Sequence, residues 1–195
     1  MPRLVVATFN VHGGVDGWGR AYDVVDACRR LEADVLVLQE SWTPAEGPAL
    51  ADTVAAALGY EVAGRAMAPV VLYPPDDRDR RGWGPPRWPR RSAGIRAGHR
   101  SGRGAAVVRG TVGLAMLWRV AARPPEVIEL GRIGTDPARR LAFSLEVGRG
   151  PAPARPALTV VGTHMSHIRH GSPVQLRRLH RVLPPPHVPA VLVGD

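Results

Sequence analysis

Four short apolar runs, each followed by a polar side chain, constrain the fold of this chain more than any other feature. The polar residues that follow them are Asn10, Glu40, His164 and Asp195. Short apolar runs bounded in this way are typical of buried β-strands. If the four strands end at one rim of a sheet assembly, the four polar side chains converge there. Loops at such rims commonly carry catalytic residues, so the pattern predicts a candidate active site.

Helices are expected between these strands. Apolar residues recur at three- and four-residue spacing over Arg20–Glu32, Gly47–Leu58 and Pro173–Leu183, which indicates helices with one buried face. The run Val35–Leu38 is apolar at every position, so we expect a strand covered on both faces. The run Ala190–Val193 is equally apolar, and we expect it to be a central strand of its sheet.

The second half of the chain is rich in strand signals. Short runs bounded by Gly, Pro or charged residues predict strands at Ala105–Val108, Val112–Val120, Val127–Leu130, Leu141–Val147 and Leu158–Val161. Gly162 follows the last of these runs. We expect this glycine to let the backbone turn, so that His164 is presented just past the end of the strand.

The length of the chain fits one domain. At 195 residues, of which 45% are hydrophobic, the chain can bury one sizeable core, and it contains no internal repeat or interdomain linker. We therefore expect a single domain over residues 1–195. No apolar run reaches the length of a membrane span, and no signal-peptide pattern is visible, so we expect a cytoplasmic protein. A single cysteine, Cys28, excludes an internal disulfide.

The charge favours a polyanionic partner. The net charge is +9, and all 26 basic residues are Arg. Arginine binds phosphate oxygens with a planar pair of donors, which favours a phosphate-binding surface. A GC-rich genome also favours Arg codons, and it explains the 22 Gly and 20 Pro residues as well. Both interpretations stay open.

An insertion rich in Arg, Pro and Gly is expected at about residues 74–103. Its segment Asp76–Arg103 contains nine Arg and three Asp, which gives a charge of +6 out of the total of +9. We expect no regular secondary structure there and the lowest order in the chain. One interpretation is a loop that follows a nucleic-acid backbone, with Trp83 and Trp88 stacking on bases. The alternative is a solvated insertion without a ligand.

Five motifs together resemble the endonuclease/exonuclease/phosphatase family. They are Ala7-Thr8-Phe9-Asn10-Val11, Gln39-Glu40, Gly162-Thr163-His164-Met165-Ser166, Gln175-Leu176-Arg177-Arg178-Leu179 and Val191-Leu192-Val193-Gly194-Asp195. The resemblance covers the whole chain except the insertion. It implies a four-layer α/β/β/α sandwich of two mixed sheets. It also implies a divalent cation, usually Mg²⁺ or alternatively Mn²⁺, and hydrolysis of a phosphate ester.

The resemblance also implies a role for each candidate residue. Glu40 matches the carboxylate that binds the metal in this family, and a hard cation prefers such oxygen ligands. Asn10 matches an asparagine that positions metal and phosphate. Asp195 resembles the aspartate that orients or deprotonates the attacking water. His164 matches the histidine that contacts the phosphate and stabilises its growing charge.

Two further sets of residues are candidate ligands. Arg139 or Arg140 falls where some members of the family place an arginine that contacts phosphate. His164, His167 and His170 form an H-x-x-H-x-x-H run that could indicate zinc. This run spans a strand end and a turn at Gly171, so its three rings share no helical face, and we do not expect zinc.

The sequence departs from the family pattern after Asp195. The resemblance implies further strands, an Asn and an Asp-His pair beyond that point, so we expect a domain that is missing its C-terminal strands and is poorly soluble or weakly active. The expected function is metal-dependent hydrolysis of a phosphodiester, as in a nuclease. The alternatives are a phospholipid or inositol phosphate esterase, and a non-catalytic remnant that binds phosphate or nucleic acid.

Overall fold

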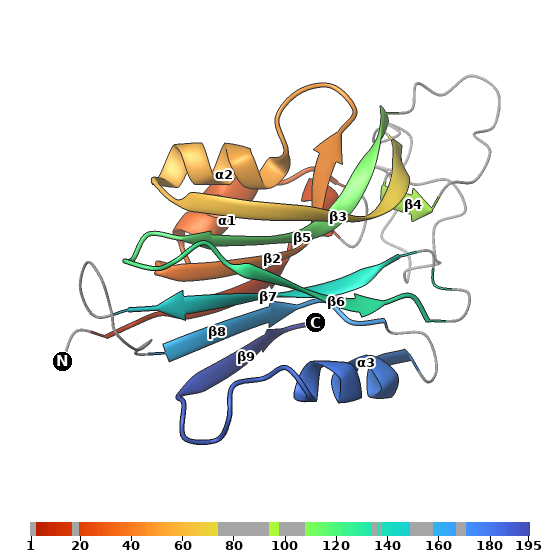
Figure 1. The fold of residues 1–195 in the computed structure, drawn as a ribbon. Helices are drawn as coiled ribbons and strands as arrows, with labels where there is room; N and C mark the ends of the chain where they lie inside the picture. The colour runs from red at the N-terminus through yellow and green to blue at the C-terminus, as the bar shows by residue number, and fades with distance from the viewer. Residues whose placement is uncertain are drawn as a thin grey trace.

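Two mixed β-sheets form the centre of the molecule, and helices cover their outer faces (Figure 1). The computed structural model describes residues 3–16, 20–73, 94–97, 108–133, 136, 138–148, 158–166 and 171–195. The first sheet contains β1 (Val6–Asn10), β2 (Val35–Pro44), β3 (Glu61–Tyr73), β4 (Gly94–Ala97) and β5 (Val108–Trp118). The second contains β6 (Glu126–Gly131), β7 (Arg140–Val147), β8 (Leu158–Thr163) and β9 (Ala190–Gly194). The helices are α1 (Val24–Arg29), α2 (Leu50–Leu58), α3 (Gly171–His180) and the short 3₁₀ helix η1 (His12–Gly14).

Each sheet contains both parallel and antiparallel pairs of neighbouring strands. The first sheet has the order β1-β2-β5-β3-β4 and the second has the order β6-β7-β8-β9. The pairs β1–β2 and β8–β9 are parallel, whereas the other neighbours are antiparallel. Helices α1 and α2 lie on the outer face of the first sheet, and α3 lies on the outer face of the second (Figure 1). The molecule is therefore the four-layer α/β/β/α sandwich that the resemblance implies.

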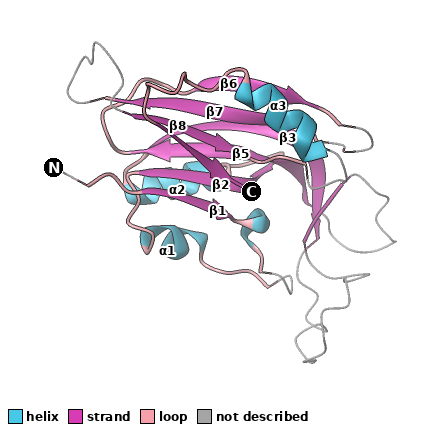
Figure 2. Ribbon diagram, turned by 90° about the horizontal axis from the view of Figure 1, so that it is seen from below, coloured by secondary structure: helices cyan, strands magenta, loops and turns pink. Residues whose placement is uncertain are grey.

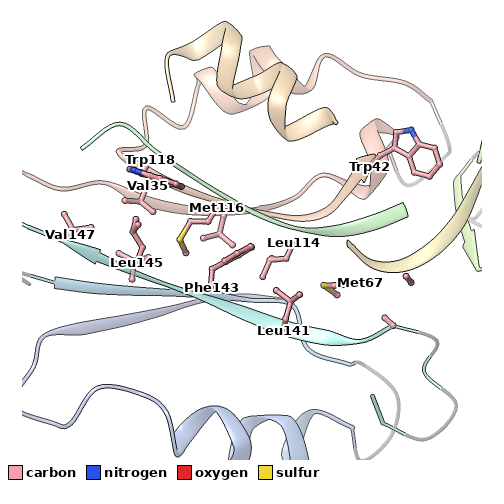
Figure 3. Close-up of a cluster of buried hydrophobic side chains, with 14 of the residues drawn as sticks. Val35, Trp42, Met67, Leu114, Met116, Trp118, Leu141, Phe143, Leu145 and Val147 are labelled. Carbon is pink, nitrogen blue, oxygen red and sulfur yellow. The ribbon is translucent and has the colours of Figure 1, made fainter. Parts of the chain in front are cut away.

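The largest apolar core lies between the two sheets (Figure 3). Val35 and Met116 from the first sheet are fully buried there, together with Phe143 and Leu145 from the second. Burial of one such side chain stabilises the folded state by about 1.5–3 kcal/mol. This inter-sheet core holds the two sheets in a single arrangement, which is the arrangement that places their strand ends at a common rim.

Strand β2 contributes to two cores at once. Val35 and Val37 face the second sheet, whereas Leu36 and Leu38 face α1 and α2. All four side chains are 0% exposed. The prediction that this strand is covered on both faces is therefore confirmed. The physical reason is that β2 is an interior strand of a sheet with a layer packed on each side.

The predicted helices exist but have different bounds. Helix α1 is shorter than predicted because Asp23 caps its first turn, accepting a hydrogen bond from the Asp26 N–H at 2.9 Å. Helix α2 ends where expected, since Gly59 adopts the left-handed conformation with φ +73°. Helix α3 begins and ends slightly earlier than the predicted Pro173–Leu183. None of the described helices is long and apolar enough to cross a membrane.

Two strands of the first sheet were not predicted. Strand β3 was not predicted, because its alanines, Gly64 and Pro69 lower its strand propensity; pairing with β5 along nearly its whole length decides its conformation. The segment Gly94–Ala97 was expected to be irregular but forms β4, paired with β3. The rest of the insertion, at 74–93 and 98–103, lies outside the described residues, as does 105–107 of one predicted strand.

The position of β9 also differs from the prediction. In this chain β9 lies at the edge of the second sheet and pairs only with β8 among the described strands. Its residues alternate between half-buried and exposed, and Leu192 is 41% exposed. An apolar run alone cannot distinguish a central strand from an edge strand, because that difference depends on which neighbours the fold provides.

Candidate active site

The four candidate residues lie together at one rim of the sandwich. Asn10 is the last residue of β1, and Glu40 lies within β2. His164 follows β8 directly, and Asp195 follows β9. Because β1 is parallel to β2 and β8 is parallel to β9, the paired strand ends point the same way. The C-terminal end of β9 lies beside β1 and β2 (Figure 2).

Asn10 joins the two carboxylates of the rim. Its Nδ2 donates a hydrogen bond to Oε1 of Glu40 at 3.3 Å and to Oδ2 of Asp195 at 2.8 Å. Its Oδ1 accepts a hydrogen bond from the His12 N–H at 3.0 Å. In this conformation the amide nitrogen faces both acids. The amide therefore offsets repulsion between two like charges and fixes their relative positions.

A β-bulge presents Glu40 at the rim. The pairing of β2 with β5 shifts register between Leu38 and Ser41, and Glu40 has a φ of +52°. A left-handed conformation is costly for a residue other than glycine and tends to persist at functional sites, where bulges often redirect a side chain. The neighbouring Gln39 is 1% exposed, and its Nε2 donates to Oγ1 of Thr8 at 2.8 Å. This bond ties the bulge to β1.

Two histidines face the carboxylate of Glu40. Nε2 of His164 lies 4.0 Å from Oε1, and Nε2 of His12 lies 3.9 Å from Oε2. The side chain of His164 is 10% exposed, whereas that of His12 is 48% exposed. His12 was not predicted as a site residue. The sequence signal that could have identified His12 is its place in the glycine-rich segment directly after β1. In the structure, His12 begins η1 and has a φ of +47°.

Glycines control how β8 and β9 approach their neighbours. Gly194 has a φ of +147°, and a Cβ there would lie 2.1 Å from the Thr163 carbonyl oxygen. Only glycine permits this close approach of β9 to β8. Beyond it, the Met165 N–H donates to the Asp195 carbonyl oxygen at 2.9 Å.

The expected turn at Gly162 was wrong, because Gly162 lies inside β8. A Cβ there would lie 2.6 Å from a methyl carbon of Val37, so this glycine serves close packing of the sheets.

The two candidate arginines have different environments. Arg139 is exposed, and its backbone N–H donates to the Met67 carbonyl at 2.9 Å. The side chain of Arg140 is only 7% exposed, and its Nε donates to Oδ2 of Asp136 at 2.9 Å. Its charge is therefore already compensated inside the protein, which makes it less available to a phosphate than Arg139.

Asp136 is held as a charged group despite its burial. Burial raises the pKa of its carboxyl, but hydrogen bonds from the Ala138 N–H and from the Arg140 and Ser166 side chains, together with the charge of Arg140, outweigh burial. The net effect lowers the pKa of Asp136 below its ordinary value. Sequence reasoning did not predict this pair, since nothing in a run of residues reveals a buried partner.

The donor set at the rim fits a hard divalent cation. Glu40 and Asp195 provide carboxylate oxygens, which Mg²⁺ and Mn²⁺ prefer, and such cations keep several water ligands. Among the described residues, no group of three or more His, Cys, Asp and Glu side chains is arranged so that it could hold a metal ion. His167 and His170 lie outside the described residues. Nδ2 of Asn10 and Nε2 of both His12 and His164 lie within 4.0 Å of the Glu40 carboxylate.

Comparisons with known proteins agree with this architecture. A family model described as the endonuclease/exonuclease/phosphatase family matches residues 7–195. An endonuclease/exonuclease/phosphatase from Beutenbergia cavernae DSM 12333 has a similar solved structure, with 19% identity and a TM-score of 0.53, covering 97% of this chain and 46% of that one. The structure of an endonuclease/exonuclease/phosphatase family protein from Leptotrichia buccalis C-1013-b has 11% identity and a TM-score of 0.60, and the match covers 99% of this chain and 67% of that one.

A third similar structure is a mannosyl-6-phosphatase from Bacteroides thetaiotaomicron VPI-5482. It has 14% identity and a TM-score of 0.54, and the match covers 99% of this chain and 65% of that one. At these identities the similarity concerns the fold alone. This chain thus spans 46% to 67% of the length of the three structures. A search of curated protein sequences found no significant match.

Proposed function

The chain belongs to the endonuclease/exonuclease/phosphatase family, and on that premise we propose that it hydrolyses phosphodiesters with the help of a divalent cation, as a nuclease does. One observation carries the proposal. Nδ2 of Asn10 donates to both Glu40 and Asp195, and Nε2 of His164 lies 4.0 Å from Oε1 of Glu40. Side chains carried by β1, by β2 and by the residues directly after β8 and β9 therefore meet at one rim. Two carboxylates, an amide and an imidazole are the groups that such a reaction needs.

Each residue has a role that its position supports. Glu40 would hold the cation, and Asn10 would keep Glu40 and Asp195 at a constant separation. When bound, Mg²⁺ or Mn²⁺ supplies Lewis-acid polarisation of the phosphate oxygens. Asp195 would orient the attacking water and accept its proton. His164 would donate its Nε2–H to a non-bridging phosphate oxygen as negative charge develops.

The bonds that change are those at phosphorus. The water oxygen forms a new P–O bond while its proton passes to Asp195. The P–O bond to the leaving group breaks, and the released alkoxide takes a proton from solvent. His164 acts only as a hydrogen-bond donor in this scheme. Its ring is nearly buried, which strengthens its interaction with the developing charge because little water competes.

The proposed substrate class is nucleic acid. The net charge of +9 favours a polyanion, and the exposed Arg139 could contact a phosphate near the rim. Phospholipid and inositol phosphate esters are the second class. If the insertion follows a nucleic-acid backbone, replacing its nine arginines with Ser should flatten the salt dependence of oligonucleotide binding. The control replaces Arg29 and Arg30, which pair with Asp26 on α1 and should leave the slope unchanged.

Hydrolysis assays test the function itself. The full chain is assayed with bis(p-nitrophenyl) phosphate and with p-nitrophenyl phosphate, with and without Mg²⁺ or Mn²⁺. The proposal expects cation-dependent hydrolysis of the diester that falls by about 10²-fold or more in Glu40→Gln and Asp195→Asn. The exposed Glu46→Gln serves as the matched control, because Glu46 lies on the loop after β2.

The outcomes separate the alternatives. Hydrolysis of the monoester alone would indicate a phosphatase. Salt-dependent binding of an oligonucleotide, with no hydrolysis of either ester, would indicate a non-catalytic phosphate-binding protein. Equal activity in Glu40→Gln and the wild type would show that the rim is not the active site.

A further inference from the structure

A buried polar network lies behind the loop that carries His164. Ser166, two residues after His164, is 0% exposed and is held from three directions. Its backbone N–H donates to Oε1 of Gln175 at 2.8 Å. Its carbonyl oxygen accepts a hydrogen bond from the Ser172 hydroxyl, and its own hydroxyl donates to the Asp136 carboxylate. Few degrees of freedom remain for the loop between Thr163 and Ser166.

The Asp136 side of this network is buried and fully hydrogen-bonded to its neighbours. Asp136 is 2% exposed and accepts hydrogen bonds from the Ala138 N–H at 2.9 Å and from Nε of Arg140 at 2.9 Å. Arg140 begins β7, whose Ala142 pairs with Thr163 of β8. Through its bonds to Arg140 and to the Ser166 hydroxyl, Asp136 therefore connects the start of β7 to the loop that leaves β8.

The Gln175 side connects the same loop to α3 and β6. Gln175 is 0% exposed, and its Nε2 donates to the Gly131 carbonyl at 3.2 Å while its Oε1 accepts from Ser166. A guanidinium nitrogen of Arg178 donates to the Leu130 carbonyl nearby. Helix α3 is thus fixed both to the end of β6 and to the loop that carries His164.

Stability is not the only contribution that such a network can make. Replacing a buried ion pair with apolar side chains is often neutral or stabilising, so a buried pair indicates specificity of geometry as readily as stability. A phosphate-contacting group has to be held within a fraction of an ångström of its productive position, and groups around it commonly supply that restraint. The network ends on the residue two positions after His164, where it can restrain that imidazole.

Given the phosphoesterase function proposed above, on which this inference rests, we propose that Asp136, Ser166 and Gln175 are positioning residues for His164. They hold the backbone of the loop so that Nε2 of His164 stays directed at the reacting phosphate beside Glu40. Arg140 then serves this network through Asp136 and does not contact the phosphate itself.

A double-mutant cycle tests the proposal in the full chain. Ser166→Ala removes one hydroxyl and leaves the Asp136–Arg140 pair intact, so it is the variant least prone to unfold. With bis(p-nitrophenyl) phosphate and Mg²⁺, Ser166→Ala should lower kcat by about 10- to 100-fold and leave KM nearly unchanged. In a His164→Ala background the same substitution should have no further effect on kcat. Thr159→Ala, at the opposite end of β8, is the control for loss of a buried side chain.

Equal losses from Ser166→Ala in the two backgrounds would overturn the proposal, because a general loss of structure acts whether or not His164 is present. A decrease in kcat for Ser166→Ala no larger than the decrease for Thr159→Ala would overturn the proposal as well.

A second readout is independent of catalysis. In protein labelled with ¹⁵N-histidine, the ring signals of His164 are identified by their disappearance in His164→Ala. Ser166→Ala and Gln175→Leu should shift or broaden these signals, and Thr159→Ala should not. Unchanged His164 signals in both network variants would reject the positioning role. If the wild-type chain hydrolyses no phosphate ester, the proposed function fails, whereas the ring signals still decide whether the network holds His164.

Discussion

Asn10 donates a hydrogen bond to Asp195 at 2.8 Å, which joins residues 185 positions apart in the chain. The same Nδ2 also contacts Glu40. Because Asn10 and Glu40 belong to the first sheet and Asp195 follows the second, this one amide links the two sheets at the rim. The relative position of the two carboxylates therefore depends on how the sheets are packed.

We expect Asn10→Ala to lower cation-dependent diester hydrolysis by about 10²-fold, because both carboxylates lose the donor that positions them. Asn10→Asp is the matched variant, since it has nearly the same shape but adds a third carboxylate. Without a divalent cation Asn10→Asp should unfold at a lower temperature than Asn10→Ala, and Mg²⁺ should raise its Tm more. Thermal denaturation with and without Mg²⁺ measures this. Identical Tm values for the two variants in both conditions would contradict the proposed cation site.

Gly162→Ala should destabilise the protein by about 1–3 kcal/mol through overpacking. The new Cβ would lie 2.6 and 2.8 Å from the two methyl carbons of Val37 and 3.0 Å from Cε of Met116, so the sheets must move apart. Denaturant unfolding measures the change. Gly64→Ala in β3 is the control, because nothing lies within 4 Å of its added Cβ, and it should change stability by less than about 0.5 kcal/mol. If Gly162→Ala had the same free energy of unfolding as the wild type, the sheets would be less closely packed at this point.

Gly194→Ala should separate activity from stability. The added Cβ would meet the Thr163 carbonyl oxygen at 2.1 Å, so the end of β9 and Asp195 must shift. We expect hydrolysis to fall by about 10²-fold with only a small decrease in Tm, since β9 is an edge strand. Gly59→Ala also places alanine at a positive φ, but in open space after α2. It should lower stability and leave hydrolysis unchanged. Full activity in Gly194→Ala would exclude Asp195 from the reaction.

The lowered pKa of Asp136 predicts a pH dependence of stability. In the folded protein this carboxyl has a pKa below its ordinary value of 3.8. The ionised group therefore stabilises the fold at pH values above 3.8, and this contribution is lost as the pH falls through the lower pKa of the folded state. Asp136→Asn should be less stable than the wild type at neutral pH, because Arg140 loses its partner charge.

Unfolding measured from neutral pH to below 3.8 checks this expectation. The difference between the wild type and Asp136→Asn should shrink only at the acid end of that range. Asp52→Asn, at an exposed position of α2, is the control and should show no comparable loss. A constant difference between the wild type and Asp136→Asn across the range would show that the carboxyl is not stabilised in its charged form.

Much of the architecture could be read from local patterns in the sequence. Apolar runs predicted β1, β2, β8 and β9, and periodic apolar residues predicted the three α-helices within a few residues of their bounds. The polar residues after those apolar runs identified the rim, where Asn10, Glu40, His164 and Asp195 lie together. These signals are local because burial of one face imposes a period on neighbouring residues.

The remaining features depend on contacts between residues far apart in the chain. Strand β3 forms because β5 offers it a partner, despite a composition that disfavours strands. Gly162 was expected to make a turn, and only the approach of Val37 from the other sheet explains it. His12 and the buried Asp136–Ser166–Gln175 network became visible once their elements were placed side by side. The apolar runs of the sequence alone determined β1, β2, β8 and β9 and the polar residues that follow those runs. Tertiary packing decided which atoms meet, because close packing and buried hydrogen bonds join segments that no local pattern connects.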